Sequence, residues 1–126
     1  MRIECHLPVS PSTNTYWRRN GNRYFVSESG VKYKALVRCA FGDDFVGFGG
    51  HCRLKVTVHY YPKDKRVCDL DNRLKGLLDA LMEVGVFEDD SQIDDLRIVR
   101  EAIVPKGLMY VVIEELEQVV DVGNVA

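Results

Sequence analysis

The sequence lacks several features that would each have assigned it quickly to a class of protein. It has no apolar run near the roughly 20 residues that cross a bilayer, so we expect no membrane-spanning segment. Residues 1–6 lack the apolar stretch of a signal peptide, so we expect a cytoplasmic protein. The formal net charge is only −2 over 126 residues, without the strong positive excess common among nucleic-acid-binding proteins.

Zinc-binding and phosphate-loop patterns are missing as well. The four cysteines are scattered and form no Cys-x2-Cys pair, and the three histidines complete no zinc spacing. We therefore expect reduced, mostly buried thiols and no structural zinc site. The glycines at 47–50 lack the lysine of a phosphate-binding loop. Residues 42–50 are accordingly interpreted as a flexible connection.

Strand and helix patterns are present along most of the chain. Alternating apolar and polar residues predict strands, and Pro105-Lys106-Gly107 predicts a turn that pairs the last two strands as a hairpin. Residues 8–22 are rich in proline, serine and asparagine, so we expect a loop there. The predicted strands are 3–7, 23–26, 53–61, 96–103 and 108–114.

Two helices are expected between these strands. Ser27 or Ser29 can cap the first, and its apolar face is predicted from Val31, Ala35, Leu36 and Cys39. A leucine stripe marks the second helix, which Gly85 ends. The members of the stripe are Leu70, Leu74, Leu77, Leu78 and Leu81.

These elements favour an α+β fold, with one mixed but mainly antiparallel sheet and two helices in a single domain. We place that domain at residues 1–116 and expect a tail at 117–126 that frays. A chain of this length has a thin hydrophobic core, which makes a homodimer a reasonable way to bury more surface.

The segment from Asp69 to Lys75, read Asp-Leu-Asp-Asn-Arg-Leu-Lys, carries the sharpest chemical signal. Asp69 and Asp71 are two residues apart and can converge on one side of an extended segment. Lys75 lies one helical turn after Asp71 and can reach the same place. The alternative is a structural role, with Asp71 as an N-cap in a surface ion pair worth about 0.3–0.5 kcal/mol. For this motif alone the structural role is the commoner one.

A second acidic run follows the leucine-rich helix. The apolar pair Val86-Phe87 should hold Asp89 and Asp90 near the core, although a solubilising loop remains an alternative for both. Gathered carboxylates repel one another unless a cation neutralises them. Oxygen ligands favour Mg²⁺, with Mn²⁺ as a substitute. A site of this kind activates water for phosphodiester hydrolysis, and Lys75 could bind phosphate, stabilise charge or orient the water.

Basic and aromatic residues gather in two further segments. In the first, arginines next to aromatic rings suit the stacking of exposed bases and the binding of phosphate. Coverage of the core by Tyr16 and Trp17 is the alternative there. The candidate DNA-binding residues are Tyr16, Trp17, Arg18, Arg19, Arg23, Lys63, Lys65 and Arg66.

Taken in order, these motifs resemble those of the RusA family of Holliday junction resolvases, small nucleases often carried by phages and prophages. The resemblance covers nearly the whole chain. It includes Pro-Val-Ser-Pro-Ser-Thr-Asn-Thr-Tyr-Trp-Arg-Arg at 8–19 and Val-Ser-Glu-Ser-Gly at 26–30. It continues through the Asp69–Lys75 segment, Asp-Ala-Leu at 79–81 and Asp-Asp-Ser-Gln at 89–92. Each motif alone is weak, and the specificity comes from finding all of them in register.

The resemblance implies a function and a set of residues. It implies a homodimer that binds four-way DNA junctions and makes paired nicks with Mg²⁺, in recombination and repair. The catalytic acids carry over to Asp69, Asp71 and Asp90, with Asp89 as a possible additional acid, and the essential lysine to Lys75. One departure is Val67-Cys68, where family members often have a basic residue, and this predicts weaker phosphate binding there.

Two other functions remain open at this point. One is a junction-binding or DNA-binding dimer with weak or lost catalysis. The other is a metal-dependent phosphohydrolase acting on small phosphate esters. The intact acidic set favours catalysis over binding alone, because DNA binding gains nothing from uncompensated carboxylates. The arginine-aromatic loop favours a polymer over a small substrate.

Overall fold

The computed structural model describes residues 1–12, 17–21 and 23–117, with residues 17–20, 23 and 24 described by their backbone alone. Tyr16 therefore lies outside the described residues, as does all but the first residue of the tail predicted at 117–126. Among the described residues, no helix is long and apolar enough to cross a bilayer.

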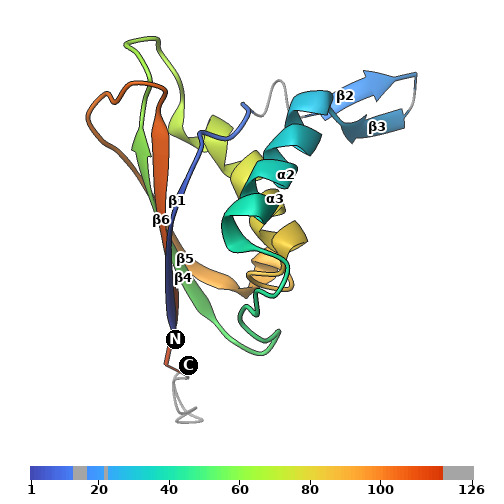
Figure 1. The fold of residues 1–126 in the computed structure, drawn as a ribbon, viewed down its shortest axis with the longest axis vertical. Coiled ribbons are helices and arrows are strands. Elements are labelled where there is room, and N and C mark those ends of the chain that lie inside the picture. Colours follow the sequence, from blue (N-terminus) through green and yellow to red (C-terminus); the bar gives the residue numbers. More distant parts are fainter. Residues whose placement is uncertain (13–16, 22, 118–126) are drawn as a thin grey trace, which may run out of the picture.

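A four-stranded sheet forms one layer of the fold. Its order is β1 (Arg2–Leu7), β6 (Leu108–Glu115), β4 (Leu54–Tyr61) and β5 (Ile93–Arg100). β6 runs antiparallel to both β1 and β4, while β4 and β5 are parallel. Both helices cover the same face of this sheet (Figure 1). The predicted α+β fold with a mixed, mainly antiparallel sheet is thus confirmed.

The hairpin predicted around residues 105–107 is wrong. The turn itself exists, since Gly107 N donates to Val104 O at 2.9 Å. However, β4 lies between the two strands that this turn connects. β4 and β5 are joined through a helix, which is the long crossover that a parallel pair requires. β5 therefore pairs with β4 and not with β6.

The first helix, α2, spans Glu28–Phe41 and begins after the predicted cap Ser27, whose Oγ accepts from Gly30 N at 3.2 Å. Its buried face consists of Gly30, Tyr33 and Val37. The apolar face predicted from sequence is therefore wrong, because Val31 and Leu36 are 57% and 53% exposed. Tyr33 supplies both a large apolar ring and a hydroxyl that donates to Pro8 O, which fixes the helix in this rotation.

The second helix follows its predicted pattern. A short 3-10 helix, η1 (Leu70–Arg73), leads directly into α3 (Leu74–Val84). Leu77 and Leu81 are fully buried, and Gly85 ends the helix with a left-handed φ of 90°. This arrangement places the Asp69–Lys75 segment at the N-terminal end of α3.

Residues 42–50, interpreted as a flexible connection, form a loop that packs against the core at Phe48, while most of the segment is exposed and Val46 is 80% exposed. Phe48 is 4% exposed, and its N–H donates to Val86 O at 2.8 Å. A Cβ built on Gly47 would lie 2.1 Å from Gly85 O, so glycine is needed for close approach of two backbones. The glycines here permit tight packing.

A separate two-stranded hairpin precedes α2. β2 (Trp17–Asn20) pairs with β3 (Arg23–Val26) and projects from the end of α2 away from the sheet (Figure 1). The predicted strand at 23–26 is confirmed, whereas residues 17–20 form a strand where a loop was expected. The signal was the pair Gly21-Asn22 between the two strands, a two-residue sequence typical of hairpin turns, and Gly21 has a φ of 63°.

Candidate active site

Asp69 and Asp71 lie at the start of η1, and both side chains are exposed. Asp69 occupies the N-cap position, but its side chain makes no capping hydrogen bond to the described residues. Asp71 lies inside η1, one residue after the first position. The predicted alternative, in which Asp71 caps the helix, therefore finds no support, and the two carboxylates stay available for another role.

The second acidic run forms a short turn that follows α3 in the sequence. η2 spans Asp90–Gln92, and Asp89 is its N-cap, accepting from Ser91 N at 3.1 Å. Asp89 thus uses its carboxylate to hold the turn. Asp90 projects from the first position of η2 and is exposed. The structure thus distinguishes the two acids: the Asp89 carboxylate holds the turn, whereas Asp90, which the resemblance favours, stays the candidate for chemistry.

The buried side-chain amide of Gln92 holds this turn in place. The side chain is 3% exposed, and its Oε1 accepts from the backbone N–H groups of Glu88 and Asp89 at 2.9 and 3.0 Å. Its Nε2 donates to Gly49 O and Cys52 O at 2.9 and 3.0 Å. All four hydrogen-bonding positions of the amide are used, so Gln92 ties the acidic turn to the segment before β4.

Lys75 and Asp79 accompany Asp90. Lys75 Nζ donates to Asp79 Oδ1 at 3.2 Å, and the Asp79 side chain is only 14% exposed. Both charges act on Asp90, Lys75 lowering its pKa and Asp79 raising it. The charge of Lys75 therefore acts on Asp90, and their joint role in catalysis stays a prediction. Asp79 was missed as a site residue, although its spacing of four from Lys75 was a visible signal.

The acids of the second run affect one another's protonation. The hydrogen-bonded side chain of Asp89 raises the pKa of Asp90 above its usual range, and partial burial raises it further. The backbone N–H of Ser91, with smaller contributions from Asp90, lowers the pKa of Asp89. Asp90 thus lies in a locally negative environment that a bound cation would relieve.

The donors of this region fit a hard divalent cation in type, because Asp69, Asp71 and Asp90 offer carboxylate oxygens. Among the described residues, however, no group of three or more acidic, histidine or cysteine side chains is gathered closely enough to hold a metal ion. The predicted three-acid ligand set is therefore not assembled by these side-chain positions. It stays a prediction.

Two arginines lie beside the residue that precedes Asp69. Arg73 Nε donates to Cys68 Sγ at 3.3 Å, and the Arg100 guanidinium donates to Cys68 O. Arg100 comes from the end of β5, and Arg73 from η1. Positive charge therefore reaches the place where Val67-Cys68 replaces a basic residue. Sequence order alone gave no signal for Arg100, which lies 32 residues away.

The predicted DNA-binding residues fall into two groups. Lys63 and Arg66 line a cleft whose wall also contains Asp69, and Lys65 is an exposed neighbour of that cleft. Tyr16 lies outside the described residues. Of Trp17, Arg18, Arg19 and Arg23, only the backbone is described, in the β2–β3 hairpin. Their predicted contacts with DNA stay predictions.

The mixed sheet, the crossover helix and the acidic turns define a small α+β domain with its candidate acids in the two short 3-10 helices, η1 and η2, that flank α3 in the sequence. The sequence profile of the family described as "Endodeoxyribonuclease RusA" matches residues 7–114. The chain belongs to this family.

The relatives found by comparison carry one description, crossover junction endodeoxyribonuclease RusA. The protein of Enterobacteria phage HK97 is 44% identical over 113 residues, covering 90% of this chain and 94% of its own. The protein of Escherichia coli strain K12 is 33% identical over 110 residues, covering 87% and 92%. The protein of Enterobacteria phage 82 is 32% identical over 110 residues, covering 87% of this chain and 92% of its own.

Proposed function

We propose that this protein is an endonuclease that cleaves four-way DNA junctions, using a divalent metal ion, in DNA recombination and repair. The observation that carries the proposal is family membership, which extends over almost the whole length of relatives described as crossover junction endodeoxyribonucleases. The phage origin of two of these relatives favours a role in phage or prophage DNA metabolism.

Asp69, Asp71 and Asp90 would hold the metal ion, which we propose to be Mg²⁺, with Mn²⁺ as a substitute. Such an ion supplies an activated water and stabilises the leaving oxygen in phosphodiester hydrolysis. The exposure of all three carboxylates supports this role, as does the absence of a capping bond from Asp69 among the described residues.

Lys75 would contact the phosphate that is cleaved. Its Nζ is held at 3.2 Å from Asp79, and its charge acts on Asp90. An ammonium held in this way could stabilise negative charge that develops on the phosphate oxygens. Asp79 acts through Lys75 as a positioning residue.

We further propose that the active form is a homodimer, because two sites related by a two-fold axis suit a two-fold junction and paired cuts. Exposed apolar side chains support an additional interface. Val31 is 57% exposed on α2, and Leu96 and Val99 are both 42% exposed on the edge strand β5. Light scattering after size-exclusion chromatography measures the oligomeric state, and a monomer would contradict this part of the proposal.

The decisive test incubates the protein with a synthetic four-way junction and with linear duplex, with and without Mg²⁺. We expect metal-dependent paired nicking of the junction alone. Asp71→Asn should bind the junction but cleave it about a hundredfold more slowly or worse, since even partners that only orient metal ligands contribute 10–100-fold.

Asp43→Asn is the matched control, because Asp43 is an exposed turn residue that follows α2. It should cleave at the wild-type rate. Equal cleavage by Asp71→Asn would remove Asp71 from the ligand set. A wild-type protein that neither binds nor nicks the junction would contradict the proposed function and favour a hydrolase of small phosphate esters.

A further inference from the structure

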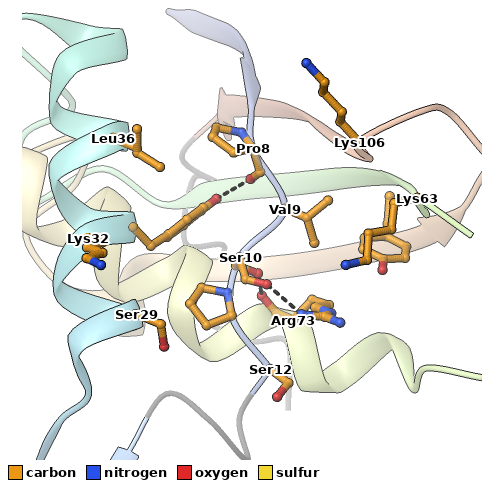
Figure 2. Close-up of a pocket in the computed structure, with 13 residues that line it drawn as sticks. Pro8, Val9, Ser10, Ser12, Ser29, Lys32, Leu36, Lys63, Arg73 and Lys106 are labelled. Atoms are coloured by element: carbon orange, nitrogen blue, oxygen red, sulfur yellow. Dashed lines mark hydrogen bonds between the residues drawn. The ribbon is translucent and has the colours of Figure 1, made fainter. Parts of the chain in front are cut away.

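A cleft of about 600 Å³ lies between α2 and the turn that precedes β6. Segment 8–12 runs through it, with Lys32 of α2 on one side and Lys63 and Lys106 on the other (Figure 2). Together with Arg73, these make four cationic lining residues, and the described lining contains no acidic one. The cleft is therefore lined by positive charge, although the net charge of the whole chain is −2.

The floor of this cleft is held firmly. Tyr33 Oη donates to Pro8 O at 2.8 Å, which fixes segment 8–12 to α2. Ser10 is 1% exposed; its Oγ donates to Arg73 O at 2.5 Å, and Arg73 Nη1 donates back to Ser10 O at 2.8 Å. These bonds cross from segment 8–12 to α2 and to η1, so the cleft is preorganised.

The ammonium groups of the three lysines can bind an anionic ligand. Lys63 and Lys106 form no ion pair with any described residue. Lys32 pairs with Glu28 at 3.1 Å, but both side chains are more than 70% exposed. An ion pair this exposed contributes little and exchanges readily for another anion.

Lys106 also has an unfavourable backbone conformation. Its φ of 70° makes it the one non-glycine residue with positive φ in the described part of the chain. It follows Pro105 at the third position of the turn closed by Gly107 N and Val104 O, a position that favours glycine or asparagine. A lysine kept at a disfavoured position points to a use for its side chain.

The cleft continues toward the candidate active site. A second cavity of about 360 Å³ contains Asp69 in its wall and shares four lining residues with the first. The shared residues are Ser12, Tyr60, Lys63 and Arg73. A ligand that follows both hollows therefore passes from Lys32 and Lys106 to Asp69, which suits a polymer with repeated negative charge.

We infer that the cleft binds the sugar-phosphate backbone of DNA, with Lys32, Lys63 and Lys106 as phosphate-binding side chains that direct one strand to Asp69. This inference rests on the proposed function for its substrate. Contacts to phosphate position a nucleic acid without reading its sequence. The cleft should therefore contribute equally to the binding of a junction and of a duplex arm.

The test measures affinity for a four-way junction and for duplex in EDTA over a range of salt concentrations. Lys32→Gln combined with Lys106→Gln should weaken both complexes by roughly five- to tenfold per lysine at about 0.1 M salt, and lower the salt slope by about 2. Lys34→Gln combined with Lys55→Gln is the matched control, because it removes the same charge from outside both cavities. It should keep the wild-type slope.

Equal losses in the two double variants would assign the effect to net charge and overturn the inference, as would an unchanged slope in the cleft variant. Duplex binding that depends on the cleft lysines, without junction cleavage by the wild type, would sustain the inference and contradict the proposed function. Lys106→Gly separates binding from folding: relief of the positive φ roughly offsets the greater freedom of glycine in the unfolded chain, so the Tm should stay close to that of the wild type while the affinity falls. A large fall in Tm together with the lost affinity would overturn the assignment of Lys106 to phosphate binding.

Discussion

Gln92→Glu is the most informative single substitution, because it changes one group of a buried side chain and keeps its shape. Nε2 of the wild-type amide donates to two backbone carbonyls, Gly49 O and Cys52 O, at 2.9 and 3.0 Å. The substitution replaces this donor with a carboxylate oxygen facing two other oxygens. The bonds accepted by Oε1 from Glu88 N and Asp89 N can remain.

The expected loss of stability follows from these contacts. Gly49 O still accepts from Cys52 N at 3.1 Å, so Cys52 O is the carbonyl whose buried donor is lost. A buried carbonyl that loses its donor costs about 1–3 kcal/mol, which is a substantial share of the roughly 5–15 kcal/mol that stabilises a typical domain. For a chain of this length we expect the Tm to fall by about 5–10 °C.

Thermal and urea denaturation followed by circular dichroism measure this change, and a junction-cleavage assay well below the Tm measures the consequence for the site. Cleavage should fall too, since Gln92 holds the turn that presents Asp90. Ser91→Ala is the matched control, because Ser91 is exposed in the same turn and its backbone contacts persist. It should stay within about 0.5 kcal/mol of wild type. A Gln92→Glu protein with wild-type Tm and activity would refute the anchoring role of the amide.

Two further predictions test the packing. Gly47→Ala should destabilise the fold by about 2 kcal/mol or more, because the new Cβ would lie 2.1 and 2.4 Å from two backbone carbonyl oxygens that follow α3, whereas at Gly50 the clash involves only the exposed Glu88 side chain. Urea denaturation should therefore give a clearly higher free energy of unfolding for Gly50→Ala than for Gly47→Ala. Equal free energies of unfolding would contradict the close approach of the two backbones at Gly47. In the native protein at pH 8, iodoacetamide should label the exposed Cys39 and spare Cys5, whose pKa burial raises to about 11. Peptide mass spectrometry that finds Cys5 labelled first would contradict its burial.

Features that depend on neighbouring residues were predictable from the sequence. The alternation in β4 identified which side chains face the core, and the leucine stripe with Gly85 located α3 and its end. The candidate acids and Lys75 were also visible, because residue type and spacing within one turn are properties of the sequence. Membership of the RusA family followed from the order of these motifs.

Other features depend on which distant surfaces meet. A turn signal at 105–107 shows that the chain reverses, but strand order depends on competition among all strands for the place beside β4. The buried face of α2 was chosen by Tyr33 and Val37 against the sheet, although Val31 and Leu36 are as apolar. In the same way, the structure separated Asp89 from Asp90 through contacts of the η2 turn.

The sequence alone therefore determined most of the local helices and strands and the types of side chain available to the site. Helix and strand periodicities are set by residues only a few positions apart. The tertiary structure decided what these residues do together. It tied Gln92 to the segment before β4, placed Arg100 beside Cys68, and brought Lys32, Lys63 and Lys106 to one cleft. Such contacts join positions tens of residues apart, and their free energy depends on packing geometry that no local pattern records.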